Sequence, residues 1–221
     1  PGLSLLARER PPPQLALFLD GNGSGVVPRD TGADGSTAYL DGLGSALPYH
    51  LQSNPRVLLP GLGGGSGLLQ ALSLGAGQVT VVELDANRAA LLRPYLSDTL
   101  ERPEVELRVM ELRGFLARSD RRFGLIQLDL LGGGGSGGLH AQSAGFLLTA
   151  EALSAYLEHL APGGMLAVTQ WLRLPPRPAL KLAATLGELL RRQGVADPGA
   201  RMALIRSWKT TTLILKNGPF D

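Results

Sequence analysis

A glycine-rich stretch and the acid that follows it are the first features of this sequence that could bind a ligand. GLGGGSG (61–67) follows the apolar run RVLLP, and Glu83 ends the next apolar run, QVTVVE. Glycines let backbone N–H groups approach a ligand, and a carboxylate placed there can accept hydrogen bonds from both hydroxyls of a ribose. The alternative for Glu83 is a simple exposed side chain. The predicted nucleoside site comprises Gly61, Gly63, Gly65 and Glu83.

Asp129 ends the fourth apolar run, FGLIQLD. The carboxyl ends of strands are where open α/β sheets bind their ligands. A carboxylate there could accept a proton from an attacking amine and orient that amine for in-line displacement. The alternative is that Asp129 only caps the glycine-rich segment after it. Gln170 and Trp171 follow the fifth run and could line the same pocket, although Trp171 fits core packing equally well.

Glu111 follows the third apolar run, where such folds place an acid against the adenine amino group. The alternative is a solvated acid in the first turn of a helix, beside Arg113. The glycine stretch reads GxGxG, with Ser66 at the sixth position of a GxGxxG pattern. This departure favours a nucleoside sulfonium ligand over NAD. An NAD-binding oxidoreductase remains the minor alternative.

The elements that position these residues alternate between short apolar runs and amphipathic stretches. The predicted strands span 56–61, 78–85, 105–110, 123–130 and 164–171. The predicted helices are 67–74, 86–97 after an Asp85 cap, 113–118, a helix from Thr149 closed by 162–164, and 178–192. Such alternation predicts a parallel sheet with right-handed crossovers. Strands 201–208 and 210–216 are almost contiguous, so they must form an antiparallel hairpin.

The first 50 residues have a different character. LALFLDG (15–21) and GVVPRD (25–30) flank Asn22-Gly23, a dipeptide typical of hairpin turns. We therefore predict a small N-terminal β-hairpin extension over 1–50 and a Rossmann-like nucleoside-binding catalytic domain over 51–221. The fold class is α/β: a Rossmann-like methyltransferase fold, with a mostly parallel sheet ending in an antiparallel hairpin and helices on both faces.

Composition excludes several classes of function. The formal net charge is +2 and the basic residues are scattered, so no nucleic-acid partner is expected. The chain has no cysteine, and His50, His140 and His159 lack metal-ligand spacing, so we expect no metal and give the histidines no role beyond the surface or loops. No apolar run reaches the roughly 18 residues of a membrane span. A cytoplasmic domain is the expectation.

Together these residues resemble the spermidine synthase family of aminopropyltransferases. The resemblance runs from about Leu15 to Lys216, through LFLDG, Tyr39-Leu40-Asp41 before ALPYHL, NPRVLLPGLGGGSG, VVELD, RFGLIQLD and LAPGGMLAVTQW. It implies a small N-terminal β domain on a methyltransferase-like Rossmann domain. It also implies transfer of an aminopropyl group from decarboxylated S-adenosylmethionine to a diamine in polyamine biosynthesis, and a homodimer.

The resemblance assigns Glu83 to the ribose, Glu111 to the adenine, Asp129 to catalysis and Tyr39 to the acceptor pocket. Three positions depart from the family. Gly64 replaces an aspartate that helps to hold the donor's aminopropyl amine, Gly132 replaces a second aspartate, and the family's histidine falls near Ala46.

Gly132 also opens the run GGGGSGG (132–138), which resembles an engineered linker. In the family this segment covers the pocket, so the glycines could still form a lid. Nucleoside binding is therefore expected to survive better than polyamine specificity.

The leading hypothesis is a transferase that binds S-adenosylmethionine or its decarboxylated form and moves a methyl or aminopropyl group to a small-molecule acceptor, for which an amine is the first candidate. The alternative is a nucleoside-binding regulatory module that has lost catalysis, since two expected acids are glycines. Divergent relatives of this family include soluble domains of membrane-anchored chains, and the resemblance is closest to that group.

Overall fold

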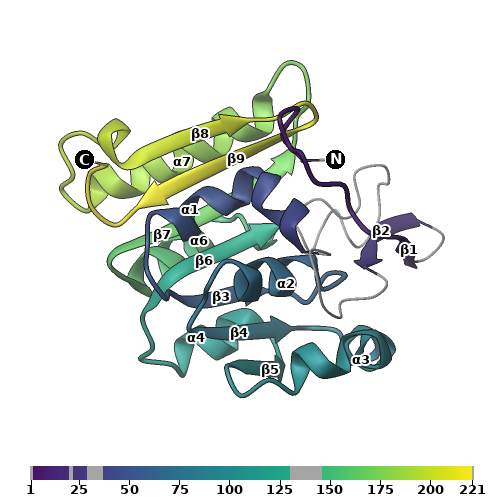
Figure 1. The fold of residues 1–221 in the computed structure, drawn as a ribbon. Coiled ribbons are helices and arrows are strands. Elements are labelled where there is room, and N and C mark those ends of the chain that lie inside the picture. Colours follow the sequence, from purple (N-terminus) through teal and green to yellow (C-terminus); the bar gives the residue numbers. More distant parts are fainter. Residues whose placement is uncertain (1, 20–21, 29–36, 130–145, 221) are drawn as a thin grey trace.

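The computed structural model of this chain describes residues 2–19, 22–28, 37–129 and 146–220. It contains a two-stranded and a seven-stranded sheet (Figure 1). The small sheet pairs β1 (Gln14–Leu19) with β2 (Asn22–Pro28) in antiparallel orientation. The strands of the large sheet are β3 (Arg56–Pro60), β4 (Gln78–Glu83), β5 (Val105–Val109), β6 (Phe123–Asp129), β7 (Leu160–Trp171), β8 (Met202–Arg206) and β9 (Thr210–Lys216).

The large sheet has the order β5-β4-β3-β6-β7-β9-β8. The strands from β5 to β7 are parallel, while β9 runs antiparallel to both β7 and β8. This confirms the predicted Rossmann-like methyltransferase fold, with its parallel sheet and antiparallel terminal hairpin. Parallel strands bring their carboxyl ends to one edge, and this edge carries the candidate site.

Helices cover both faces of the large sheet. One face is packed by α1 (Leu47–His50), α2 (Ser66–Ser73) and α3 (Ala86–Leu100), and the other by α4 (Leu112–Ala117), α6 (Ala150–Glu158) and α7 (Arg177–Arg192). Three 3₁₀ helices complete the order: η1 (Ala38–Gly42), η2 (Gly44–Ala46) and η3 (Gly199–Arg201). Because strand side chains alternate, β3, β4, β6, β7 and β9 each contribute buried residues to both cores. In β6, for example, Leu125 belongs to the α1–α3 core and Ile126 to the α4–α7 core.

Two sequence-based boundaries were wrong. The helix from Thr149 ends at Glu158 rather than at 162–164. Strand β7 begins at Leu160, so the one proline and two glycines of 162–164 lie inside its irregular start. Asn22 pairs with Leu19 as the first residue of β2, so the Asn22-Gly23 pair belongs to the strand and not to the turn. The cap at Thr149 is confirmed, since its hydroxyl accepts a hydrogen bond from the Ala152 N–H at 3.3 Å.

The β1–β2 hairpin docks beside the glycine stretch. Figure 1 places it at the side to which the arrowheads of β4 and β6 point. Val27 is buried in the same core as Leu62 of the glycine stretch and Tyr49 of α1. The described helices include none that is long and apolar enough to cross a membrane.

Candidate functional site

The predicted glycines form a loop whose shape depends on them. Gly61, Gly63 and Gly65 have φ values of +109°, +56° and +90°, a region that residues with a Cβ rarely adopt. A Cβ added at Gly61 would lie 3.9 Å from Oε2 of Glu83, and nothing lies within 4 Å of one added at Gly63. The loop therefore keeps open space beside Gly63 and directs the backbone of Gly61 toward the acid.

Glu83 is buried, with 2% of its surface exposed, so the interpretation as an exposed residue was wrong. Its Oε2 accepts a hydrogen bond from the Leu62 N–H at 2.8 Å, and its Oε1 accepts one from the Asp85 N–H at 2.9 Å. The Arg88 guanidinium lies 3.7 Å from Oε2. Each carboxylate oxygen has a second acceptor lone pair beyond its backbone donor. Asp85 caps α3 as predicted.

The structure has room only for glycine at position 64, where the resemblance leads one to expect an aspartate. A Cβ at this position would lie 1.9 Å from the carbonyl oxygen of Val26, on β2. No side chain fits unless the hairpin moves. At Gly65 a Cβ would lie 2.7 Å from the Leu96 side chain. Leu96 has non-helical torsions two residues after Pro94, where the proline kinks α3.

Asp129 lies at the carboxyl end of β6, beside the first turn of α2. Its Oδ2 accepts a hydrogen bond from Gln127 Nε2 at 2.9 Å and lies 3.1 Å from the position of a Cβ on Gly67. The residue keeps exposed surface, but protein surrounds its carboxylate closely enough that desolvation raises the pKa of Asp129, against hydrogen bonds from Gln127 and Thr169 that lower it. A carboxylate with a raised pKa is a stronger base.

Three buried polar residues next to Asp129 were missed by the sequence analysis: Tyr49, Gln70 and Gln127. Tyr49 donates to Gln127 Oε1 at 2.8 Å, and Gln127 Nε2 also donates to Gln70 Oε1 at 2.9 Å. Burial raises the pKa of Tyr49 well above its usual range, helped by the charge of Asp129, so Tyr49 remains a neutral donor. The available signal was Gln127 itself, a polar residue inside an apolar strand and two positions before Asp129.

Two further predicted site residues are Tyr39 of η1 and Glu111, which follows β5. Tyr39, in η1, is buried, and its hydroxyl makes no hydrogen bond of standard geometry with the described part of the chain. Burial raises the pKa of Tyr39, and the nearby Gln14 and Ser66 side chains oppose this. Glu111 is the N-cap of α4, where its two oxygens accept hydrogen bonds from the N–H groups of Arg113 and Gly114.

The two residues at the end of β7 do not face the same way. Trp171 lies two residues after Thr169 on β7, so the two side chains share a face of the sheet, and Thr169 pairs with Asp129. Gln170 lies between them and therefore faces the opposite side. Gln170 is buried there with its Oε1 unpaired among the described residues. The structure therefore brings Trp171, but not Gln170, onto the face that carries Asp129 and Glu83.

The glycine run 132–138, with Gly132, lies outside the described residues, as does His140. Across the described ranges no three His, Cys, Asp or Glu side chains form a group that could hold a metal ion. His159 lies in the turn between α6 and β7, as expected of a loop residue. It is half-buried, and its ring nitrogens lie 2.7 Å from the Ala155 carbonyl and 3.0 Å from the Ser119 carbonyl, which ties α6 to the end of α4.

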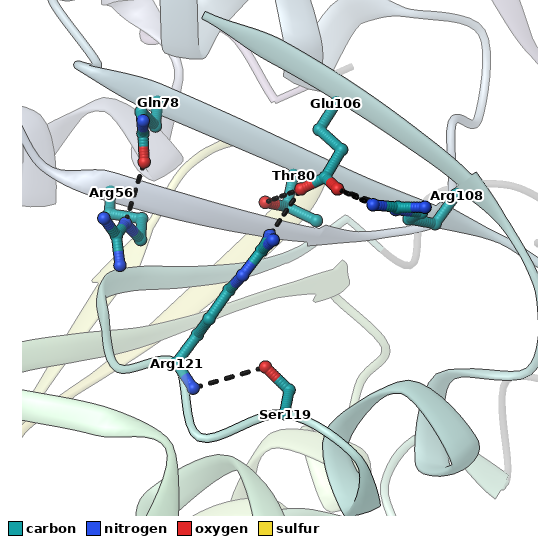
Figure 2. Close-up of polar contacts among 7 residues, drawn as sticks. All are labelled: Arg56, Gln78, Thr80, Glu106, Arg108, Ser119 and Arg121. Carbon is teal, nitrogen blue, oxygen red and sulfur yellow. Dashed lines mark hydrogen bonds and ion pairs between the residues drawn. The ribbon is translucent and has the colours of Figure 1, made fainter.

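A second polar cluster lies on the face that α4 covers, toward the β5 edge of the sheet (Figure 2). Glu106 of β5 pairs with Arg108 and with Arg121, and Arg121 also donates its backbone N–H to Ser119 Oγ at 3.2 Å. Arg108 and Arg121 also line a surface hollow of about 310 Å³. Glu106 lies at the start of β5, so this cluster is separate from the carboxyl-end site.

The fold and this edge define a class of chain: a Rossmann-like domain of the methyltransferase type with a glycine loop, a buried acid after the second parallel strand and an acid after the fourth. No protein-family model matches the chain, and no curated protein is similar to it.

Solved structures share the fold at low identity. A probable spermidine synthase from Corynebacterium glutamicum is 19% identical with a TM-score of 0.68, over 99% of this chain and 78% of its own. A spermidine synthase in complex with the transition-state analogue AdoDATO is 19% identical with a TM-score of 0.57, over 88% of this chain and 63% of its own. The ribosomal protein L11 methylase from Lactobacillus delbrueckii subsp. bulgaricus is 19% identical with a TM-score of 0.54, over 86% and 83%. This chain thus spans less than two thirds of the AdoDATO-bound enzyme.

Proposed function

We propose that this chain is a transferase whose group donor is S-adenosylmethionine or decarboxylated S-adenosylmethionine. The observation that carries the proposal is the shared location of the Gly61–Gly65 loop, Glu83 and Asp129 on one face of one sheet edge. The loop is open beside Gly63, and Glu83 is held by two backbone donors with acceptor sites to spare. These features suit a ribose, and structural neighbours that are spermidine synthases and methyltransferases support a nucleoside sulfonium.

Each residue has a definite part in such a transfer. Glu83 accepts the ribose hydroxyls, and Glu111, which follows β5, accepts a hydrogen bond from the adenine amino group. The proposed acceptor is a small molecule with a nucleophilic amine. Its nitrogen forms a bond to the transferred carbon as the carbon–sulfur bond breaks, and sulfur leaves as a neutral thioether. Asp129 orients the amine and takes its proton.

The alternative of a nucleoside-binding module without transfer is favoured by one observation. At Gly64 the Val26 carbonyl occupies the space of any side chain, so the acid expected from the resemblance cannot be accommodated there. Such a module would bind the nucleoside through the same loop and Glu83. The two proposals differ only in what Asp129 does.

Calorimetry with both donors, and NADH as a comparison, tests the nucleoside site. Glu83→Gln should weaken donor binding at least about tenfold, because a hydrogen bond to a charged group contributes about 1.5–3 kcal/mol. Glu104→Gln removes the charge of a partly exposed glutamate paired with Arg102; it is the matched control and should bind as the parent does. Equal binding by Glu83→Gln, or binding of NADH alone, contradicts the proposal.

A further inference from the structure

A row of buried polar side chains leads from the protein interior to Asp129. It comprises Ser45 of η2, Tyr49 of α1, Gln70 of α2 and Gln127 of β6, and none is more than 4% exposed. Buried amides and hydroxyls are costly unless they are hydrogen-bonded. Every side chain in this row has a partner, and the bonds are 2.8–2.9 Å long. These four residues, called the amide network below, connect three helices to one strand.

The direction of each bond in the amide network follows from one obligatory acceptor. Gln70 Nε2 donates to the backbone carbonyl of Leu40 at 2.8 Å, and a carbonyl can only accept. The Oε1 of Gln70 must therefore face the other way, where it accepts from Ser45 Oγ and from Gln127 Nε2. An amide placed the other way round at Gln70 would put its NH₂ against that of Gln127.

The same logic fixes the amide of Gln127. Its Nε2 lies against Gln70 Oε1 and has one further hydrogen, which points at Asp129 Oδ2. Its Oε1 accepts from the Tyr49 hydroxyl. A tyrosine hydroxyl can donate or accept, so Tyr49 alone would not prevent a flip of this amide. Gln70 does prevent it, although among the described residues no hydrogen bond joins Gln70 to Asp129.

A fixed amide donor has a direct effect on the acid at the end of the row. An ionised carboxylate accepts hydrogen bonds without donating, so an N–H that always points at Oδ2 favours the charged form and holds its orientation. The close approach of Gly67 restricts Oδ2 on the α2 side. Neutral partners do this without introducing a cation that would neutralise the base.

We propose that Gln127 is a positioning residue that keeps Asp129 ionised and oriented, and that Gln70 acts through it by fixing the direction of its amide. The catalytic meaning of this role rests on the proposed function, in which Asp129 takes the acceptor's proton. The effect of Gln127 and Gln70 on the protonation of Asp129 can be measured without a donor and without turnover.

The test is an NMR titration of Asp129 with ¹³C-labelled aspartate side chains, using Asp129→Asn to assign the resonance. Gln127→Met, which removes the donor at similar volume, should move the Asp129 pKa upward. Gln70→Met should also move it upward, because the Gln127 amide is then free to turn its oxygen toward the acid. The matched control is Gln52→Met, since the buried Nε2 of Gln52 has no partner among the described residues and its loss should leave Asp129 unchanged.

The outcomes separate the proposal from a general packing effect. Equal upward shifts in all three variants, or no shift in Gln127→Met, overturn it. A shift in Gln127→Met without one in Gln70→Met overturns the role given to Gln70. If Gln127→Met does not fold, as judged by its amide spectrum, Gln70→Met still decides.

Calorimetry keeps the two proposals apart. Failure of both donors to bind would remove the proposed function and leave the titration result intact. Once an acceptor is found, the acid limb of the kcat/KM profile should shift to higher pH in both network variants.

Discussion

Two polar regions of this molecule shift the pKa of a carboxylate in opposite directions, at Asp129 and at Glu106. Among the described residues Asp129 meets only neutral donors, and desolvation raises its pKa. Glu106 meets two guanidinium groups, and its pKa is lowered, first by Arg121 and then by Arg108 (Figure 2). No ion pair involves Asp129 in the described ranges of the chain. In the proposed function Asp129 takes a proton, and neutral donors hold it without cancelling its charge, whereas the two cations beside Glu106 neutralise that acid.

The largest expected effect comes from removing the base. Asp129→Asn keeps the shape and can still accept from Gln127, but it cannot take the acceptor's proton. We expect turnover to fall by about 10²- to 10⁴-fold, the usual contribution of general base catalysis. Glu106→Gln is the control and should leave turnover unchanged. Once an acceptor is known, steady-state assays of both variants measure this difference. Full activity of Asp129→Asn would contradict the role of Asp129 as a base.

A second effect is on folding stability, measured by urea unfolding. Gln127→Met leaves the Tyr49 hydroxyl buried without its partner, so we expect a loss of about 1–3 kcal/mol. Glu106→Gln should cost less than about 1 kcal/mol, because its ion pairs are partly exposed. Adding about 1 M salt, which shortens the screening length to about 3 Å, should erase the Glu106→Gln effect and spare the other. A larger loss in Glu106→Gln would reverse the comparison.

The smallest effects are pH dependences of opposite sign. Because burial raises the pKa of Asp129 in the folded chain, this group retains a proton that the unfolded chain has lost, so its contribution to the stability of the parent falls as pH rises above about 3.9, the ordinary aspartate value. Asp129→Asn should gain relative to the parent over that window. Glu106 has a lowered pKa, so its stabilisation is present above about 4.3 and disappears as pH falls through its folded pKa. Thermal unfolding of both variants from neutral to acidic pH measures the two slopes, and parallel slopes would contradict this assignment.

The sequence was sufficient to predict the fold because its signals are local. Alternating apolar runs identified each parallel strand, and Asp85 and Thr149 are caps that the next few residues define. The start of β7 was misplaced because Leu160 pairs with Phe123 of β6, far away along the chain. The start of β2 was misplaced because Asn22 itself pairs with Leu19 of the neighbouring β1.

The site was predictable only in part. The glycine loop and Glu83 have a recognisable spacing. The contact of Gln70 with Gln127 has no such sequence pattern, because neither segment contains a signal that the two amides lie together in the fold. The sequence also could not predict that the carbonyl of Val26 lies against Gly64. It suggested a lost acid at a position where the structure leaves no room for a side chain.

The glycine loop has a kinetic consequence. Its neighbours are Val26 against Gly64, Leu96 against Gly65 and Asp129 against Gly67, from segments far apart along the chain. Such non-local contacts form only after long loops have closed, so the loop should acquire its final shape late in folding. By the same reasoning it belongs to the parts that open first in the native state. A ligand bound there would tie these three segments together, and its effect should be greatest on amide exchange in the loop and the hairpin rather than in the central strands.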